Sequence, residues 1–149
     1  MTTVRPLAPG DVEQVVALLG TLFAQEADFS PDPDRQRWAL RALLAEPARG
    51  LVLVAAEREQ VLGSVLLIPA LSTALGGVAC WLEDFVVHPD QRGRGVGGAL
   101  LRAAVREAER RGWSRISVLT DGDNDRALHL YRAAGFVRSS MTLLRRHSG

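Results

Sequence analysis

The sequence predicts an α/β fold in which helices cover both faces of a mixed sheet, with the element order βααβββαβαβ. Short apolar runs typical of strands alternate with longer segments whose apolar residues recur at helical spacing. Short turns join the second, third and fourth strand candidates, which favours antiparallel pairing, and a helix-length crossover before the fifth favours a parallel pair. With 149 residues and no internal repeat, the chain is predicted to be one domain, residues 1–149.

The first third of the chain is predicted to hold one strand and two helices. Residues 2–7 form a strand candidate that a Pro-Gly turn closes, and Asp11 can cap the helix that follows. Residues 25–34 are polar and contain two prolines, so we expect a loop before a second helix over 38–44. The apolar face of the first helix is predicted to be Val12, Val15, Val16, Leu19, Leu22 and Phe23.

Strands and a further two helices are predicted for the rest of the chain. A polar turn at 57–60 and a Gly-Gly pair at 76–77 separate three apolar runs, and glycines end both later helices. In chain order the expected elements are strands 51–56, 61–68 and 78–88, a helix 96–112, a strand 115–120, a helix 124–134 and a strand 136–144.

Composition excludes several classes of function. A formal net charge of +1 gives no field for nucleic acid, and the longest apolar runs are too short to span a membrane. The N-terminus shows no signal-peptide pattern, so we expect a cytoplasmic protein. A single cysteine, Cys80, leaves no intrachain disulfide and no paired-cysteine zinc site, and we expect no metal. All 18 basic residues are arginine, which suggests a GC-rich bacterial source.

Residues 92–98, with the sequence RGRGVGG, are the most informative stretch. Glycine lets a ligand approach the backbone closely, and free N–H groups at a helix start attract anions, so the loop is typical of a pyrophosphate site. A tight strand-to-helix turn would use glycine equally well. The spacing Gly93-x-Gly95-x-x-Gly98, with Asp121 downstream, also fits a dinucleotide fingerprint, but residues 88–92 separate these glycines from the strand end.

Two stretches resemble the signatures of the GNAT N-acetyltransferases: LEDFVVHP at 82–89 with RGRGVG at 92–97, and NDRALHLYRAAGF at 124–136. Residues 81–87 are further similar to the diamine (spermidine/spermine) acetyltransferase branch. The resemblance implies a mostly antiparallel sheet of six to seven strands with about four helices. It also implies acetyl-CoA as co-substrate, direct transfer to a primary amine in a ternary complex, and a homodimer.

The resemblance also implies a role for individual residues. Tyr131 would reach the thioester sulfur as general acid, and Glu83 would be the general base, directly or through water. The backbone of 85–87 would pair with the pantetheine arm, and the N–H groups of 92–98 would hold the pyrophosphate. The implied cofactor-binding set is Phe85, Val86, Val87, Arg92, Gly93, Arg94, Gly95, Val96, Gly97, Gly98, Asn124, Ala127 and Tyr131.

Each role has a structural alternative. Tyr131 lies on an apolar helix face and could be ordinary core, and Asn124 could only cap its helix. Glu83 and Asp84 fall on opposite faces of a regular strand, so a single cleft receives both only if a bulge intervenes. We therefore interpret Asp84 as structural or as a substrate contact. Cys80 lacks a Cys-His signature and is expected to be packed inertly.

An acidic connection between the first two helices bears on the acceptor. It carries Glu26 and Asp28, with Asp32 and Asp34 close behind, and such a rim would attract a cationic amine, although a solvated loop explains it equally well. A polyamine or an aminoglycoside is the first expectation, and an amino acid or a peptide N-terminus stays open. The alternative function is a catalytically silent acyl-CoA sensor or partner-binding module.

Overall fold

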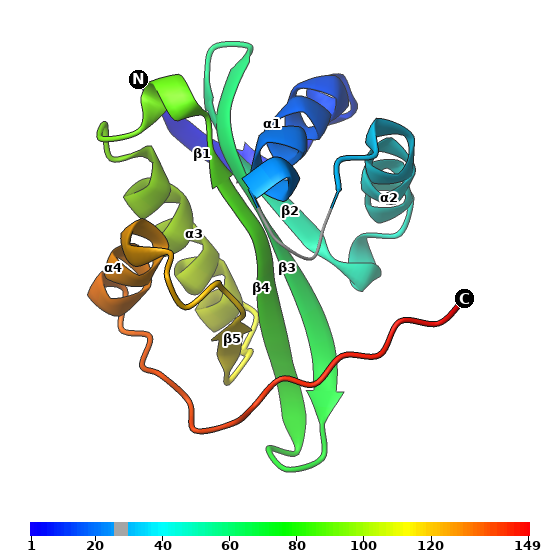
Figure 1. Ribbon diagram of the computed structural model, residues 1–149, viewed down its shortest axis with the longest axis vertical. Helices are drawn as coiled ribbons and strands as arrows, with labels where there is room; N and C mark the ends of the chain where they lie inside the picture. The colour runs from blue at the N-terminus through cyan, green and yellow to red at the C-terminus, as the bar shows by residue number, and fades with distance from the viewer. Residues whose placement is uncertain (26–29) are drawn as a thin grey trace.

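The computed structural model describes residues 1–25 and 30–149 (Figure 1). In the described residues, five strands form one sheet in the order β1-β2-β3-β4-β5. The first four pair antiparallel to their neighbours, and β4 pairs parallel to β5. The strands are β1 (Thr3–Pro6), β2 (Leu51–Glu57), β3 (Gln60–Ser72), β4 (Gly77–Val87) and β5 (Ile116–Val118).

In the described part of the chain, four helices pack on the sheet, two on each face, as the sequence predicts (Figure 1). The helices are α1 (Val12–Gln25), α2 (Pro33–Ala45), α3 (Val96–Arg110) and α4 (Asp125–Ala133). Short 3-10 turns precede α1, follow α2 and precede the loop before α3. Among the described helices, none has both the length and the apolar character that a membrane crossing requires.

Strand β2 shows why the sheet is buried on both faces. Val52 and Val54 pack under α1 and α2, whereas Leu53 and Ala55 pack under α3 and α4. Side chains of successive strand residues point to opposite faces, so a strand covered on both sides is apolar throughout. Helix α3 buries one face against the core that contains Leu53 and Ala55. The buried residues of this face are Val96, Leu100, Leu101, Ala104 and Ala108.

The strand predicted at 136–144 is wrong. Those residues take no regular structure, and the sheet of the described residues has five strands rather than six or seven. The apolar alternation in this segment favours a strand, but a strand forms only where a partner supplies hydrogen bonds. The side chains of Val137 and Met141 are 90% and 87% exposed, so no apolar surface of the described residues receives them.

Asp11 does not cap α1 as expected from the sequence. It lies within the 3-10 turn Pro9–Asp11, where its carboxylate accepts the Ala8 N–H at 2.7 Å. The Arg5 guanidinium donates two hydrogen bonds to the same carboxylate, at 2.7 and 3.0 Å. These bonds tie β1 to the start of α1, and the hydrogen bonds from Arg5 are the first cause that holds the pKa of Asp11 below its usual range.

We expect the Asp11→Asn variant to unfold more easily, by about 2 kcal/mol at pH 7, because hydrogen bonds to a buried charge are lost. Since the pKa of Asp11 is lowered in the folded state, its contribution is complete above the ordinary carboxyl pKa of about 3.9 and is lost as pH falls through the lower folded value. Urea unfolding of both proteins from pH 7 to pH 3 measures this. The difference should shrink at the acid end, and Glu59→Gln on the exposed β2–β3 turn is the control.

Candidate functional site

The site begins where β4 and β5 part. Their parallel pairing covers only Cys80–Leu82 of β4 and Ile116–Val118 of β5. From Glu83 to Val87, β4 continues with β3 on one edge, and its other edge has no strand partner in the described part of the chain. Backbone N–H and C=O groups along that edge are therefore available to an extended ligand.

A glycine loop follows β4 and starts α3. Gly95 is the N-cap of α3 at φ 82°, and Gly93 has φ 79°, a left-handed region that favours glycine. The first hydrogen bond of α3 runs from the Ala99 N–H to the Gly95 carbonyl at 3.1 Å. The N–H groups of residues 96–98 thus have no acceptor within the helix, and the helix dipole adds positive potential there.

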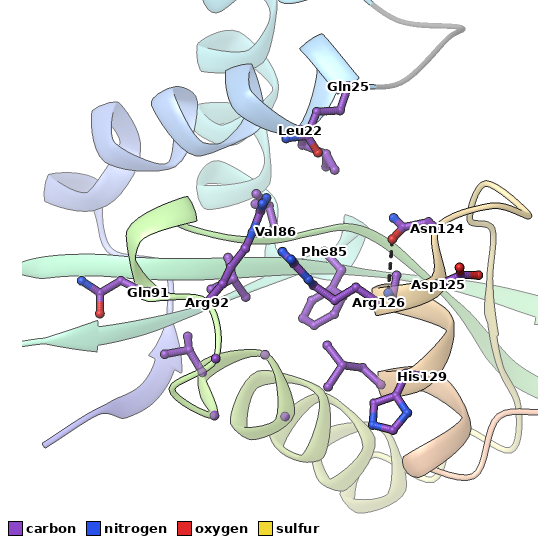
Figure 2. Close-up of a pocket in the computed structure, with 18 of the residues that line it drawn as sticks. Leu22, Gln25, Phe85, Val86, Gln91, Arg92, Asn124, Asp125, Arg126 and His129 are labelled. Carbon is purple, nitrogen blue, oxygen red and sulfur yellow. Dashed lines mark hydrogen bonds between the residues drawn. The ribbon is translucent and has the colours of Figure 1, made fainter.

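A cavity of about 810 Å³ lies over this helix start. The unpaired edge of β4 contributes Phe85, Val86 and Val87, and the loop contributes all its predicted residues from Arg92 to Gly98 except Arg94. Arg94 instead donates a hydrogen bond to the Gln91 side chain and is exposed. Figure 2 shows the labelled side chain of Arg126 extending from α4 toward the centre of the cavity, and that of Arg92 extending from the loop toward Val86. This cavity suits an elongated anionic ligand.

Gly97 sets how closely α3 approaches its neighbours. A Cβ atom at this position would lie 3.2 Å from Leu130 Cδ1 on α4 and 3.3 Å from Phe85 Cζ on β4. Glycine therefore lets α3, α4 and β4 meet at the floor of the cavity.

Asn124 begins the opposite wall. Its side-chain oxygen accepts the Ala127 N–H at 3.2 Å, which is the N-cap contact that the sequence leaves open (Figure 2). Asn124 also lines the cavity, as does Ala127 one turn later. The residue therefore caps α4 and faces the ligand space, and the two interpretations are compatible.

A β-bulge in β4 brings two acidic residues into the lining of one chamber. Two residues of β4, Asp84 and Phe85, oppose the single residue Val65 of β3 between the pairs Leu66–Glu83 and Ser64–Val86. Asp84 has φ 53°, a left-handed backbone that Asp tolerates better than most residues. The bulge interrupts the alternation, so Glu83 and Asp84 line the same chamber, which a regular strand would forbid.

This chamber has a volume of about 250 Å³ and adjoins the larger cavity, with which it shares Leu22, Gln25, Phe85, Asp123, Asn124 and Ala127. Four acidic residues, Glu83, Asp84, Asp121 and Asp123, are part of its lining, and no basic residue is among the described lining residues. Asp84 also lines a separate cavity between α1, α2 and β3. The charged residues described in the lining of this chamber are therefore all acidic, whereas the larger cavity combines Arg92 and Arg126 with Asp123 and Asp125.

Tyr131 lies on α4 at the wall of the acidic chamber and is 6% exposed. Its ring packs against Phe85 and Phe136, each at a centroid distance of 5.7 Å. The residue therefore belongs to the core and borders the chamber at the same time. The aromatic contacts hold the ring in one orientation, which a positioned acid requires.

Cys80 lies away from this chemistry. Its side chain is buried in the core under α3, and burial raises the pKa of its thiol to about 11. A protonated, buried thiol is a poor nucleophile, in agreement with the inert packing expected from the sequence.

The structure describes only part of the acidic segment between α1 and α2. Glu26 and Asp28 lie outside the described residues. Asp32 caps α2 by accepting the Arg35 N–H at 3.2 Å, and Asp34 pairs with Arg37 at 2.8 Å. These two carboxylates thus have structural partners. In the described residues, the negative charge beside Glu83 comes instead from Asp121 and Asp123, which the sequence did not single out as acceptor contacts.

Other lining residues were also missed. Leu22 and Gln25 at the end of α1 line both cavities, and Arg126 and His129 of α4 line the larger one. The sequence could have indicated the two α4 residues, because Arg126 and His129 are three residues apart and share a helix face next to Asn124. In the described residues, no group of three His, Cys, Asp or Glu side chains is placed to hold a metal ion.

The fold and cleft define a class: an α/β protein whose sheet opens beside a glycine-lined helix start to hold a long anionic ligand. Residues 16–136 match the sequence model described as acetyltransferase (GNAT) family. The chain belongs to the GNAT acetyltransferase family, whose members use acetyl-CoA, and its α/β fold is the GNAT fold.

Two named relatives are acetyltransferases. The chain is 33% identical over 151 residues to the mycothiol acetyltransferase of Kineococcus radiotolerans, covering 92% of this chain and 43% of that protein. It is 29% identical over 157 residues to the streptothricin acetyltransferase of Streptomyces lavendulae, covering 89% of this chain and 80% of that protein. The chain thus spans less than half the length of that mycothiol acetyltransferase.

Solved structures agree with the fold. An integron cassette protein from the mobile metagenome of Cole Harbour Salt Marsh is 31% identical, with a TM-score of 0.84 over 98% of this chain and 90% of that one. A predicted acetyltransferase from Clostridium acetobutylicum, solved with acetyl-CoA, is 18% identical, with a TM-score of 0.80 over 98% of this chain and 96% of that one.

Proposed function

We propose that the protein is an N-acetyltransferase that moves the acetyl group of acetyl-CoA directly to a primary amine of a small, cationic acceptor in a ternary complex. The main support for this proposal is that two different cavities meet. A long cleft with arginines and a glycine-lined helix start opens, past Phe85 and Ala127, into a small acidic chamber that Tyr131 borders.

The cleft supports the assignment of acetyl-CoA. The N–H groups at the start of α3, with Arg92 and Arg126 near them, would bind the pyrophosphate, because backbone donors and fixed positive charge converge there. The unpaired edge of β4 at 85–87 would pair with the amide groups of the pantetheine arm. An arm in this position would deliver the thioester to the junction of cleft and chamber.

The chamber supports direct transfer. A protonated amine cannot attack a thioester, so Glu83 would accept its proton, directly or through water, because this carboxylate is exposed to the chamber. The nitrogen lone pair then forms a bond to the acetyl carbon, and the carbon–sulfur bond breaks. Tyr131 would donate a proton to the departing thiolate. The acylated nitrogen loses its second proton to become an amide, which restores the Tyr131 hydroxyl through water, and Glu83 releases its proton to solvent. Products are the N-acetyl amine and CoA, and no external redox partner is needed.

Four carboxylates around a small chamber support a cationic acceptor. An extra ammonium group on the substrate would lower the repulsion among them and would bind more tightly than a neutral group of the same size. The similarity of 81–87 to the diamine branch and the named streptothricin acetyltransferase relative fit this substrate class. Polyamines and aminoglycosides are the first acceptors to test.

A thiol-release assay over a panel of amines tests the function. We expect CoA release with acetyl-CoA and a polyamine or aminoglycoside, an N-acetyl product by mass spectrometry, and less turnover with monoamines of matched length. Binding of acetyl-CoA without turnover on any amine would contradict the proposal and favour an acyl-CoA sensor. Turnover only on amines without a second ammonium group would contradict the cationic acceptor but not the transferase.

Substitution of the two bulge carboxylates separates their roles. We expect Glu83→Gln to lower kcat about 100-fold, the scale of general base catalysis. Asp84→Asn should mainly raise KM for a polyamine, because it removes one charge from the chamber. The reverse pattern, with the kcat loss in Asp84→Asn, would move the base to Asp84. Steady-state kinetics from pH 6 to 9 distinguish the two.

A further inference from the structure

A cavity of about 200 Å³ lies between α1, α2 and the sheet, and the acetyl-transfer mechanism does not use it. Figure 1 shows α1 and α2 together on one face of the sheet. Most of the residues that line this space, the α1–α2 cavity, are apolar, among them Leu19, Phe23, Leu40, Leu43, Val52 and Leu66. An apolar pocket with a few well-placed polar groups is typical of a site for a small organic molecule.

Gln36 of α2 adds a polar group to this lining. Its Oε1 atom is buried and has no hydrogen-bond partner among the described residues. Most buried polar atoms in proteins are paired, because an unpaired one lowers the stability of the fold. The side-chain amide can turn about its last torsion, which exchanges the places of its oxygen and its NH₂ group. A donor placed in the α1–α2 cavity would therefore supply the partner that Gln36 lacks.

Ser64 adds a second polar group from the sheet. It is 2% exposed and pairs with Val86 of β4. Cross-strand partners point to the same face of a sheet, and Val86 belongs to the core under α1 and α2. The Ser64 hydroxyl therefore lies on the face that borders the cavity, across from Gln36 on α2. Polar side chains on both the helix wall and the sheet wall favour a ligand with a hydrogen-bonding group over a pure hydrocarbon.

The α1–α2 cavity adjoins the acidic chamber at the bulge of β4. Asp84 lines both spaces. Leu66 in the lining of the cavity is the cross-strand partner of Glu83 in the lining of the chamber, and neighbouring strands lie about 5 Å apart. An extended chain covers that distance in about four bonds, because a residue of three backbone bonds spans about 3.3–3.6 Å. An acceptor whose amine lies at Glu83 can thus extend into the cavity.

Charge decides which donor suits the cavity. Arg35 also lines it, with a side chain that is 89% exposed, so positive charge lies at the solvent side. Transfer of an ammonium group from water into an apolar space is far less favourable than transfer of a neutral hydroxyl, and Arg35 would repel the ammonium further. Negative charge lies only at Asp84, on the boundary with the chamber. The interior of the cavity therefore suits a neutral donor.

We propose that the α1–α2 cavity binds a non-reacting arm of the acceptor, an aliphatic chain of about four carbons that ends in a hydroxyl group, and that Gln36 selects this arm. A cavity of about 200 Å³ equals the volume of about six water molecules at about 30 Å³ each, which is enough for such an arm. The proposal rests on the proposed function, since the arm is placed relative to an amine at Glu83. Gln36 is a specificity-determining residue and does not touch the reacting atoms.

Binding of three probes tests the arm without any need for turnover. Each probe is a propanediamine with one group on one nitrogen, which is hydroxybutyl, pentyl of the same heavy-atom count, or methyl. Calorimetric titration into the protein saturated with CoA should show the hydroxybutyl probe binding about five-fold more tightly than the pentyl probe, the scale of one neutral hydrogen bond. Equal affinity of these two probes would overturn the proposal.

The Gln36→Leu variant tests the selecting residue. We expect it to remove the preference for the hydroxybutyl probe over the pentyl probe, because the cavity then offers an apolar side chain at this position. Gln60→Leu, an identical change at an exposed position at the start of β3, is the control and should keep the preference. A preference that Gln36→Leu leaves unchanged would overturn the role of Gln36. Circular dichroism checks that both variants are folded.

Filling the cavity tests the location of the arm. Ala39 lines the cavity from α2 and is exposed, so Ala39→Phe adds a ring there without crowding the core. We expect the affinity for the hydroxybutyl and pentyl probes, each relative to the methyl probe, to fall about ten-fold. Ala45→Phe at the exposed end of α2 is the matched control and should change neither ratio. Unchanged ratios in Ala39→Phe would place the arm elsewhere and overturn the proposal.

A thiol-release assay with the same probes separates this proposal from the proposed function. We expect the hydroxybutyl probe to be acetylated with a higher kcat/KM than the pentyl probe, in the order of their affinities. Acetylation of all three probes with equal kcat/KM would overturn the arm and support the transferase. The expected binding preference without any acetylated product would support the cavity as a ligand site and contradict the transferase.

Discussion

Replacement of Tyr131 by Phe is expected to lower kcat by ten-fold or more, towards 100-fold, while the dissociation constant of acetyl-CoA stays within about two-fold of the wild type. The hydroxyl is lost from the wall of the acidic chamber, so the departing thiolate has no positioned proton donor. The ring remains and keeps its contacts with Phe85 and Phe136. Rapid-quench turnover and calorimetric titration measure the two quantities.

A variant of the neighbouring ring controls for packing. Phe136→Leu disturbs the aromatic contact of Tyr131 but keeps the hydroxyl, so it should lower the free energy of unfolding and affect kcat much less. If Tyr131→Phe turned over at the wild-type rate, Tyr131 would be a core residue and another group would protonate the thiolate. If both variants lost turnover equally, the loss would come from packing.

Replacement of Gly95 by Val is expected to weaken acetyl-CoA binding by ten-fold or more. Gly95 has φ 82° and caps α3 at the cavity, so a β-branched residue strains the loop and puts a side chain where the pyrophosphate must approach. A hydrogen bond to a charged group is worth about 1.5–3 kcal/mol, and about 1.4 kcal/mol is a factor of ten in affinity. Loss of one such bond therefore reaches the expected effect.

Gly76 provides a matched control. It has φ 62° in the β3–β4 turn, and a Cβ there would meet nothing within 4 Å, as at Gly95. Gly76→Val should lower the free energy of unfolding by about 1–3 kcal/mol through backbone strain, as Gly95→Val should. It should leave acetyl-CoA binding unchanged. If both variants bound acetyl-CoA like the wild type, the loop would be only a strand-to-helix turn. If both weakened it equally, the effect would be general destabilisation.

Most of the fold could be predicted because its signals are local. Apolar runs place β2, β3 and β4, and helical spacing with glycine at the C-terminal ends places α3 and α4, within a few residues of their observed bounds. The prediction of a strand at 136–144 was wrong because a period-two pattern indicates strand propensity but not whether a neighbouring strand is present to pair with. The prediction that Asp11 caps α1 was wrong because the Asp11 carboxylate accepts hydrogen bonds from Arg5 instead. This contact joins β1 to the turn, and no local sequence pattern predicts it.

The candidate site could likewise be predicted only where its signals are local. The glycine loop and the N-cap at Asn124 follow from spacing within one turn of chain. The joint chamber of Glu83, Asp84, Asp121 and Asp123 could not be predicted, because it depends on a bulge in β4 and on the parting of β4 from β5. Only the three-dimensional fold brings the loop after β5 beside that bulge.

The most direct test is a crystal structure of the protein soaked with CoA and a polyamine. The account predicts that the pyrophosphate lies against the N–H groups of residues 95–98, the pantetheine arm runs along 85–87, and the sulfur ends within hydrogen-bond reach of Tyr131 while an ammonium group occupies the acidic chamber. A diphosphate bound away from the start of α3, or no CoA at saturating concentration, would contradict it.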